Sequence, residues 1–205
     1  MRKIDVFTHI FPARYVERMM DLAATMKDVG KRVRGVPMLA DLDVRFEIMD
    51  LHPGYQQILS IATPPVDAYA SVSEAIDLTQ RANDGMAELV QKYPDRFPGF
   101  IAWLPMNDVD ATMRELERSM GALNARGIQV CSNVQGKALD LPAFQPVFAA
   151  MAAYDLPIWL HPYRSADIAD YPTEERPLYE IWWTLGWPYE SSVAMARLVF
   201  SGIFD

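Results

Sequence analysis

The sequence alternates short apolar runs rich in β-branched residues with stretches of helical periodicity, and this alternation constrains the fold more than any other feature. Such alternation is typical of βα units, in which helices cover a sheet of parallel strands. The sequence therefore predicts an α/β fold with about five βα units. The five predicted strands are Lys3 to His9, Gln57 to Ala62, Pro98 to Leu104, Gly127 to Cys131 and Leu156 to His161.

Helical spacing and capping residues predict the helices between these strands. Ser71 and Glu74 have the spacing of a capping box at the start of a long helix that ends at Lys92. Asn107 and Asp108 can cap the helix that follows the third strand. The remaining predicted helices are Ala13 to Met26, Leu42 to Leu51, Pro142 to Tyr154, Pro177 to Gly186 and Ser191 to Phe200.

Charge and composition exclude several classes of protein. With 19 basic and 27 acidic residues the net charge is −8, which opposes the electrostatic attraction that dominates nucleic-acid binding. No apolar stretch reaches the roughly 20 residues that span a bilayer, and Asp5 lies where a signal peptide would need an apolar core. Cys131, the single cysteine, cannot form an internal disulfide. We expect a cytoplasmic protein that binds neither nucleic acid nor membrane.

Two of the three histidines end predicted strands. His9 closes the first strand, on the face shared with Asp5 and Phe7, and His161 closes the fifth. Parallel α/β folds place their functional sites at the carboxyl ends of strands, so both histidines are candidate site residues. The alternative for His9 is a histidine hydrogen-bonded to a loop, and the spacing favours neither interpretation. His52 precedes Pro-Gly at a helix end and is predicted to be an exposed cap.

The other face of the first strand is apolar. It carries Ile4, Val6, Thr8 and Ile10, and we expect it to pack against helices.

The segment Ile4-Asp5-Val6-Phe7-Thr8-His9-Ile10-Phe11-Pro12 resembles the Ile-Asp-x-His-x-His-x-x-Pro opening of the amidohydrolase superfamily. More narrowly it is similar to the branch that contains aminocarboxymuconate-semialdehyde decarboxylase and related aromatic-acid decarboxylases. An ordered series of further matches covers nearly the whole chain. They are Arg45-Phe46-Glu47-Ile48-Met49-Asp50, Gln57-Ile58-Leu59-Ser60, Tyr93-Pro94-Asp95-Arg96-Phe97, Gly99-Phe100, Leu104-Pro105-Met106, Gly127-Ile128-Gln129-Val130, Leu160-His161-Pro162 and Gly202-Ile203-Phe204.

The resemblance implies a (β/α)8 TIM barrel, of which residues 1–205 form the N-terminal part as one domain. A complete barrel typically needs roughly 250 residues, and no sixth strand is predicted before Asp205. An incomplete barrel leaves open sheet edges and uncovered apolar surface. We therefore expect a truncated chain that forms a homo-oligomer, a dimer through the gap, or is poorly soluble.

The resemblance also implies a divalent metal, with zinc as the expected ion, held by two first-strand histidines, the fifth-strand histidine and a later aspartate. His9 and His161 match two of these ligands, whereas Phe7 stands in place of the first histidine and cannot bind a metal. The catalytic histidine and aspartate of the family would lie beyond residue 205. The alternatives are a truncated piece of a longer enzyme and a degenerate site.

Arginines and aromatic residues supply further candidates for substrate binding. Arg32 and Arg34 lie in the segment from which the family supplies a carboxylate-binding arginine, and Arg164 follows His161. The alternative for the first two is a solvated basic loop. Four tryptophans could line an aromatic pocket, with ordinary core packing as the alternative: Trp159, Trp182, Trp183 and Trp187. Cys131 is interpreted as a small buried thiol rather than a nucleophile.

The leading interpretation is a metal-dependent enzyme that decarboxylates a small aromatic or muconate-like carboxylic acid without oxidation. Hydrolysis of an ester, lactone or amide is the alternative reaction. In either reaction a metal would polarise a substrate oxygen or activate a bound water. A different class also stays open, a noncatalytic binding barrel, because of Phe7 and the absence of the later ligands.

Overall fold

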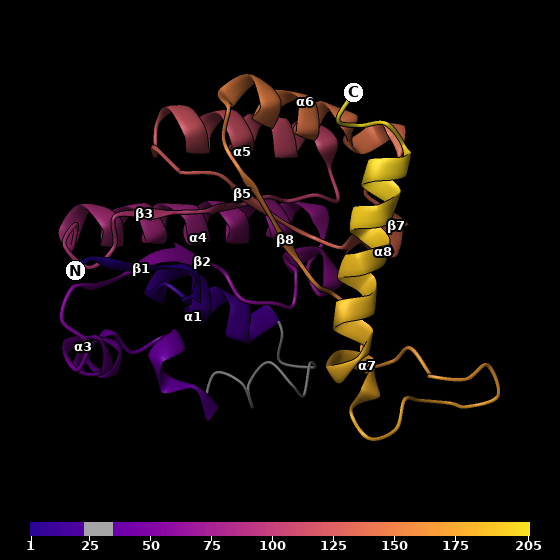
Figure 1. The fold of residues 1–205 in the computed structure, drawn as a ribbon, viewed down its shortest axis with the longest axis horizontal. Coiled ribbons are helices and arrows are strands. Elements are labelled where there is room, and N and C mark those ends of the chain that lie inside the picture. The colour runs from indigo at the N-terminus through magenta and orange to yellow at the C-terminus, as the bar shows by residue number, and fades with distance from the viewer. Residues whose placement is uncertain (23–34) are drawn as a thin grey trace. The chain divides into compact units, whose positions relative to one another are not determined.

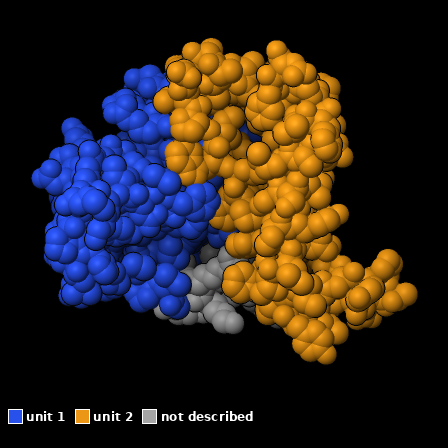
Figure 2. Space-filling view, viewed as in Figure 1, with its two compact units in different colours: residues 1–129 blue, residues 130–205 orange. Residues whose placement is uncertain are grey.

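The computed structural model describes residues 1–22 and 35–205. The chain divides into two compact units, Met1–Gln129 (unit 1) and Val130–Asp205 (unit 2), coloured separately in Figure 2. Among the described residues, no helix combines the length and the apolar character that crossing a membrane requires.

Unit 1 is built on parallel strands, as predicted. β1 (Lys3–His9), β2 (Tyr55–Ser60) and β3 (Gly99–Phe100) form a sheet in the order β1-β2-β3 (Figure 1). In the pairing of β1 with β2, His9 lies opposite Ser60. A second sheet has the order β4-β5-β8: β4 (Ala102–Trp103) pairs in parallel with β5 (Ile128–Cys131), and β8 (Ile158–His161) is a strand of unit 2. The predicted α/β class with parallel strands is confirmed.

The predicted third strand, Pro98 to Leu104, is divided between the two sheets. The Ile101 N–H donates to the Leu59 carbonyl at 2.8 Å, and the next N–H, of Ala102, donates to the Gly127 carbonyl at 2.9 Å. Successive backbone groups therefore bond to opposite neighbours, as in a strand that lies between two others. The segment joins β2 on one side to β5 on the other.

The helices of unit 1 begin where the capping residues predict. Ser71 and Glu74 form the complete capping box of α4, and the Asp108 carboxylate accepts from the Ala111 N–H at the start of α5. Only the first part of the predicted Ala13 to Met26 helix is described. The helical elements are α1 (Ala13–Leu22), η1 (Pro37–Leu39), α3 (Leu42–Asp50), η2 (Val66–Ala68), α4 (Val72–Lys92) and α5 (Val109–Gly121).

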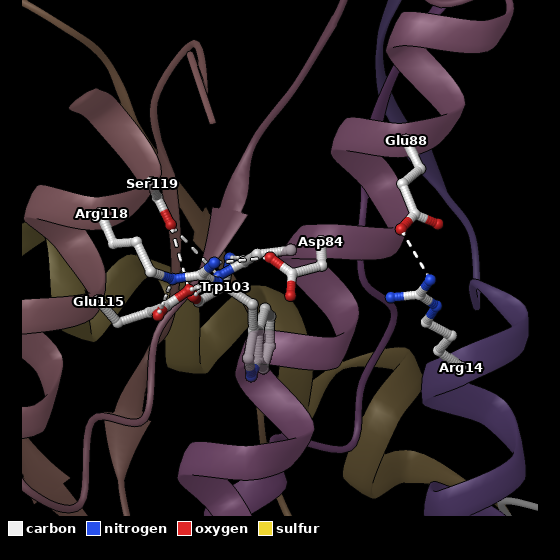
Figure 3. A network of polar contacts seen from close by, with 8 residues as sticks. Arg14, Asp84, Glu88, Trp103, Glu115, Arg118 and Ser119 are labelled. Atoms are coloured by element: carbon white, nitrogen blue, oxygen red, sulfur yellow. Dashed lines mark hydrogen bonds and ion pairs between the residues drawn. The ribbon is translucent and has the colours of Figure 1, made fainter. Parts of the chain in front are cut away.

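A buried polar network joins α4, β4 and α5 (Figure 3). The Asn83 amide donates to the Trp103 carbonyl and accepts from the Trp103 N–H, both at 2.9 Å, so it replaces a neighbouring strand for that residue. It also donates to Glu115 at 2.6 Å, and Glu115 in turn pairs with Arg118 at 2.8 Å. Buried polar groups of this kind are tolerated because they are hydrogen-bonded.

The prediction that one face of β1 packs against helices is wrong for its first half. Thr8 and Ile10 are buried, but Ile4 is 43% exposed and Val6 is 52% exposed. β1 is the outer strand of the order β1-β2-β3 and pairs within that sheet with β2. An edge strand has fewer neighbours to cover its side chains, which accounts for the exposed apolar residues.

Unit 2 contains a hairpin that the sequence analysis missed. β6 (Asn133–Val134) and β7 (Lys137–Ala138) pair antiparallel through Gln135 and Gly136, which have φ values of 51° and 78°. Two successive residues with positive φ are the requirement of a type I′ turn. The glycine at the second position was the available signal.

The rest of unit 2 follows the predicted order with shifted boundaries. It comprises η3 (Pro142–Phe144), α6 (Gln145–Tyr154), β8 (Ile158–His161), α7 (Ile181–Thr184) and α8 (Gly186–Phe200). The helix predicted from Pro177 to Gly186 forms only as α7. α8 begins well before Ser191, because Pro188 falls in its first turn, where a missing N–H is tolerated.

Candidate functional site

His9 is held at the end of β1 by the hydroxyl of Ser60. The His9 Nδ1 and Ser60 Oγ atoms are 2.9 Å apart, and Ser60 Oγ donates its proton to the Thr8 carbonyl, also at 2.9 Å. A hydroxyl has one proton, so the serine oxygen accepts from His9 and the Nδ1 atom carries hydrogen. The neutral imidazole then has its lone pair on Nε2, an atom through which histidine binds metals.

Phe7 lies beside His9, as the strand alternation predicts. Their ring centroids are 5.3 Å apart in an edge-to-face arrangement. The third member of this face, Asp5, accepts hydrogen bonds from the Tyr55 hydroxyl at 2.8 Å and from the Phe7 N–H at 3.1 Å. The position at which the resemblance implies a first-strand metal ligand is therefore occupied by an apolar ring in contact with the one histidine of this strand.

His161 ends β8 in unit 2 and is 4% exposed. Its Nδ1 atom lies 2.7 Å from the carbonyl oxygen of Pro162. A carbonyl can only accept, so Nδ1 is the donor and the lone pair of the neutral ring is again on Nε2. Both candidate ligands therefore have the same tautomer, although different partners fix it.

Tryptophans gather around His161. The Trp187 ring lies edge-to-face against His161 at 5.7 Å, and it makes similar contacts with Trp182 at 6.2 Å and Trp183 at 5.9 Å. Trp183 is exposed and Trp182 half-buried, so this cluster is only partly a packed core. Three of the four predicted aromatic residues thus lie together next to a candidate ligand.

Arg164 forms an ion pair with Glu190 of unit 2 through one end of its guanidinium. Its Nη1 atom forms an ion pair with Glu190 at 3.2 Å, and Gly186 leaves room for its side chain, because a Cβ there would lie 2.7 Å from Arg164 Cδ. The buried Nε–H of Arg164 has no hydrogen-bond partner within residues 1–22 and 35–205. Arg32 and Arg34 lie outside the described residues.

Arg45 is a site-adjacent residue that the sequence analysis did not single out. It is 2% exposed, and its guanidinium donates to the carbonyl oxygens of His9 and Met38 and to the side chain of Gln57. Burial lowers the pKa of Arg45 to about 10, which still leaves it charged at neutral pH. The available signal was its helical spacing of four from Met49, the other buried residue of α3.

The described parts of the chain contain no cluster of three or more histidine, cysteine or acidic side chains arranged to hold a metal. His9 belongs to unit 1 and His161 to unit 2. That the two share one site stays a prediction. Cys131 is buried and forms no disulfide, in agreement with its interpretation, and His52 is exposed as expected.

Comparison with known proteins gives a consistent result. Residues 4–205 match the family described as amidohydrolase. The chain is 30% identical over 99% of its length to 2-amino-3-carboxymuconate-6-semialdehyde decarboxylase of Dictyostelium discoideum, and 38% identical over 80% to gamma-resorcylate decarboxylase of Rhodococcus jostii. It spans 59% and 52% of the length of these two relatives.

A solved structure of a dihydroxybenzoic acid decarboxylase from Polaromonas, with bound manganese and the inhibitor 2-nitroresorcinol, is also similar. The TM-score is 0.78 at 32% identity, and the match covers 100% of this chain and 62% of that chain. The family match, the order of the motifs and the histidines at the ends of parallel strands agree. The chain belongs to the amidohydrolase family.

Proposed function

We propose that this chain carries the N-terminal metal-binding part of a nonoxidative decarboxylase that acts on a small aromatic or muconate-like carboxylic acid. The observation that carries the proposal is the shared tautomer of His9 and His161, each with Nδ1 engaged as a donor and its lone pair on Nε2. Metal-binding histidines in proteins are oriented in this way by a partner of the second ring nitrogen. The decarboxylase names of the relatives support the choice of reaction.

The two histidines are suitable ligands for a divalent metal, but they are fewer than the three protein ligands that a catalytic zinc normally has. His9 and His161 would hold the ion through imidazole nitrogen, which suits zinc and other transition metals. A bound ion of this kind polarises a substrate oxygen. Catalytic zinc normally has three protein ligands, and Phe7 contributes none, so we expect weak binding by residues 1–205. We propose zinc as the ion, with manganese as the alternative because the Polaromonas relative contains bound manganese.

The substrate carboxylate is assigned to arginines. Arg164 is a candidate because its buried Nε–H lacks a partner in the described ranges, and Arg32 and Arg34 remain candidates from the sequence. Arginine pairs with carboxylates in bidentate geometry. The tryptophan cluster on His161 is the proposed apolar surface for an aromatic ring.

We further propose that residues 1–205 form a single domain, the first five βα units of a (β/α)8 barrel, in a cytoplasmic dimer. The single family match over residues 4–205, which includes both units, supports the assignment to one domain. Exposed apolar residues on β1 support association with other protein surface. Light scattering that finds a monodisperse monomer would contradict the dimer.

A noncatalytic binding barrel is the second candidate function. The ring of Phe7 in contact with His9 favours it, because an apolar ring that cannot bind a metal stands where the resemblance implies a ligand. The ester, lactone or amide hydrolase of the sequence analysis remains an alternative reaction for the same metal site.

The test combines elemental analysis with an assay of carbon dioxide release. We expect the 205-residue chain to retain little metal when purified without added ions. We also expect it to release little carbon dioxide from 2,6-dihydroxybenzoate, the compound bound in a solved decarboxylase that is 28% identical to this chain. Replacement of Phe7→His should restore a ligand and raise the affinity for zinc and manganese. Unchanged metal affinity in that variant, with His9 intact, would reject the proposed site and favour the noncatalytic barrel.

A further inference from the structure

We propose that Arg45 is a positioning residue for His9: its buried guanidinium holds the carboxyl end of β1 in the place where Ser60 orients the imidazole. The metal-binding consequence rests on the proposed function, whereas the effect on His9 itself does not.

Arg45 connects three separate segments through its hydrogen bonds. Its Nε and Nη2 atoms donate to the Met38 carbonyl at 3.0 and 2.7 Å, and Nη1 donates to Gln57 Oε1 at 2.7 Å. Nη2 also donates to the His9 carbonyl. All of these acceptors are uncharged, so this buried cation is stabilised by directed hydrogen bonds rather than by an adjacent carboxylate.

A chain of hydrogen bonds connects Arg45 to Asp5 in the first half of β1. Gln57 Nε2 donates to the Tyr55 hydroxyl at 3.2 Å, and this hydroxyl donates to Asp5 Oδ2 at 2.8 Å. The donors all point from the guanidinium towards the carboxylate, the direction in which successive bonds polarise one another. Burial also raises the pKa of Tyr55, which keeps its hydroxyl protonated as a donor.

The two anchored residues of β1 flank an irregularity. The pairing of β1 with β2 shifts register between Asp5 and Thr8, just before His9. A register shift disrupts the ladder locally and bends the strand. Beyond the shift, Thr8 and His9 pair with Leu59 and Ser60 in a new register. The Arg45 network holds the side chain of Asp5 on one side of the shift and the carbonyl of His9 on the other.

Removing the guanidinium therefore has a local consequence. The carbonyls of His9 and Met38 and the amide oxygen of Gln57 lose their donor together. Gln57 is buried, so water does not readily replace the donor there. The end of β1 would shift to find other partners, and the bond from His9 to Ser60 would weaken.

The test compares Arg45→Met, Arg45→Lys and the control Asn83→Ala in the full 205-residue chain. The control removes a buried polar group of unit 1 that bonds to Trp103 and Glu115, so it destabilises the unit without touching β1. Nitrogen NMR of the imidazoles in metal-free protein reports the His9 tautomer, with His9→Gln used to assign its signals. Titration with Mn²⁺ and Zn²⁺ reports affinity under conditions where each variant is folded.

We expect Arg45→Met to give a mixture of His9 tautomers and about 10-fold weaker metal binding, the lower end of the cost of losing a supporting partner. Arg45→Lys should lie between Arg45→Met and the wild type, and it carries the test if Arg45→Met does not fold. Asn83→Ala should keep the wild-type tautomer and affinity. A His9 tautomer unchanged in both arginine variants, or altered equally in the control, overturns the proposal. A tautomer change in a chain whose wild type binds no metal supports Arg45 and rejects the proposed function.

Discussion

The two units orient their candidate ligands by different means. In unit 1 the His9 ring depends on the Ser60 hydroxyl, and its backbone depends on Arg45. In unit 2 the His161 ring bonds to the carbonyl of the next residue and packs against Trp187. The first arrangement uses side chains that single substitutions can remove, whereas the second uses backbone geometry that most substitutions leave in place. Equivalent tautomers can thus have very different sensitivity to mutation.

One polar network of unit 1 and one ion pair of unit 2 differ in their exposure to solvent. The Asn83 network of unit 1 is buried between two helices and a strand, whereas the bidentate pair of Arg197 with Asp140 in unit 2, at 2.8 and 2.9 Å, is solvent-accessible. Water competes with exposed pairs and cannot replace buried ones. We therefore expect substitutions in the Asn83 network to cost more stability than substitutions in the Arg197–Asp140 pair.

The largest effect should come from removing the ligands themselves. His9→Ala and His161→Ala are each expected to weaken Mn²⁺ binding by at least about 100-fold, because a ligand contributes more than the partners that orient it. His52→Ala, which replaces the exposed third histidine, is the control and should bind as the wild type does. Isothermal titration measures the three affinities. If only one of the two ligand variants loses affinity, the histidines do not share a site.

The next effect concerns stability. Asn83→Ala should lower the free energy of unfolding by about 3 kcal/mol, since it leaves the Trp103 backbone and Glu115 without partners. Asp140→Asn in unit 2 should cost less than about 1 kcal/mol, and less still at high salt. Urea denaturation measures both values. Equal losses would remove the contrast between buried and exposed polar contacts.

Ser60→Ala tests the side-chain mechanism of unit 1 directly. Without the hydroxyl, Nδ1 of His9 loses its acceptor, and we expect metal affinity to fall about 10-fold, within the range for such partners. Ser192→Ala is the control, because that hydroxyl donates to the carbonyl of Pro188 in its own helix. Titration of both variants with Mn²⁺ measures their metal affinities. An unaffected Ser60→Ala protein would show that His9 is oriented by backbone and packing, as His161 is.

A small effect at neutral pH is expected at a buried hydroxyl pair of unit 1. Burial raises the pKa of Tyr15 to about 12 from its usual 10.0, and its hydroxyl lies 3.0 Å from that of Tyr69, whose pKa is also raised. A raised pKa favours the protonated folded state, so this contribution is complete below pH 10 and is lost as the pH rises from about 10 to 12.

Tyr15→Phe should therefore cost about 1 kcal/mol at neutral pH, the value of one hydrogen bond, and should make unfolding less sensitive to alkali. Urea denaturation at several pH values between about 8 and 11 measures both effects. An alkaline transition as steep as that of the wild type would assign the sensitivity to other groups.

Local patterns in the sequence determined the elements and the places of the candidate ligands. The capping box of α4, the Asp108 cap and the full extent of β1 were predicted correctly because each depends on residues close in sequence. The histidines at the ends of β1 and β8 were placed by the predicted strand boundaries, and alternation gave the face of His9.

Tertiary structure alone decided how the candidate ligands are held. His9 bonds to a serine 51 positions away and to an arginine 36 positions away, and no local pattern shows which distant side chains will meet. The exposure of Ile4 and Val6 was likewise set by the place of β1 at a sheet edge rather than by its alternation. The physical reason is that periodicity fixes the direction of a side chain relative to its own strand. Its partners depend instead on which distant segments the fold places beside that strand.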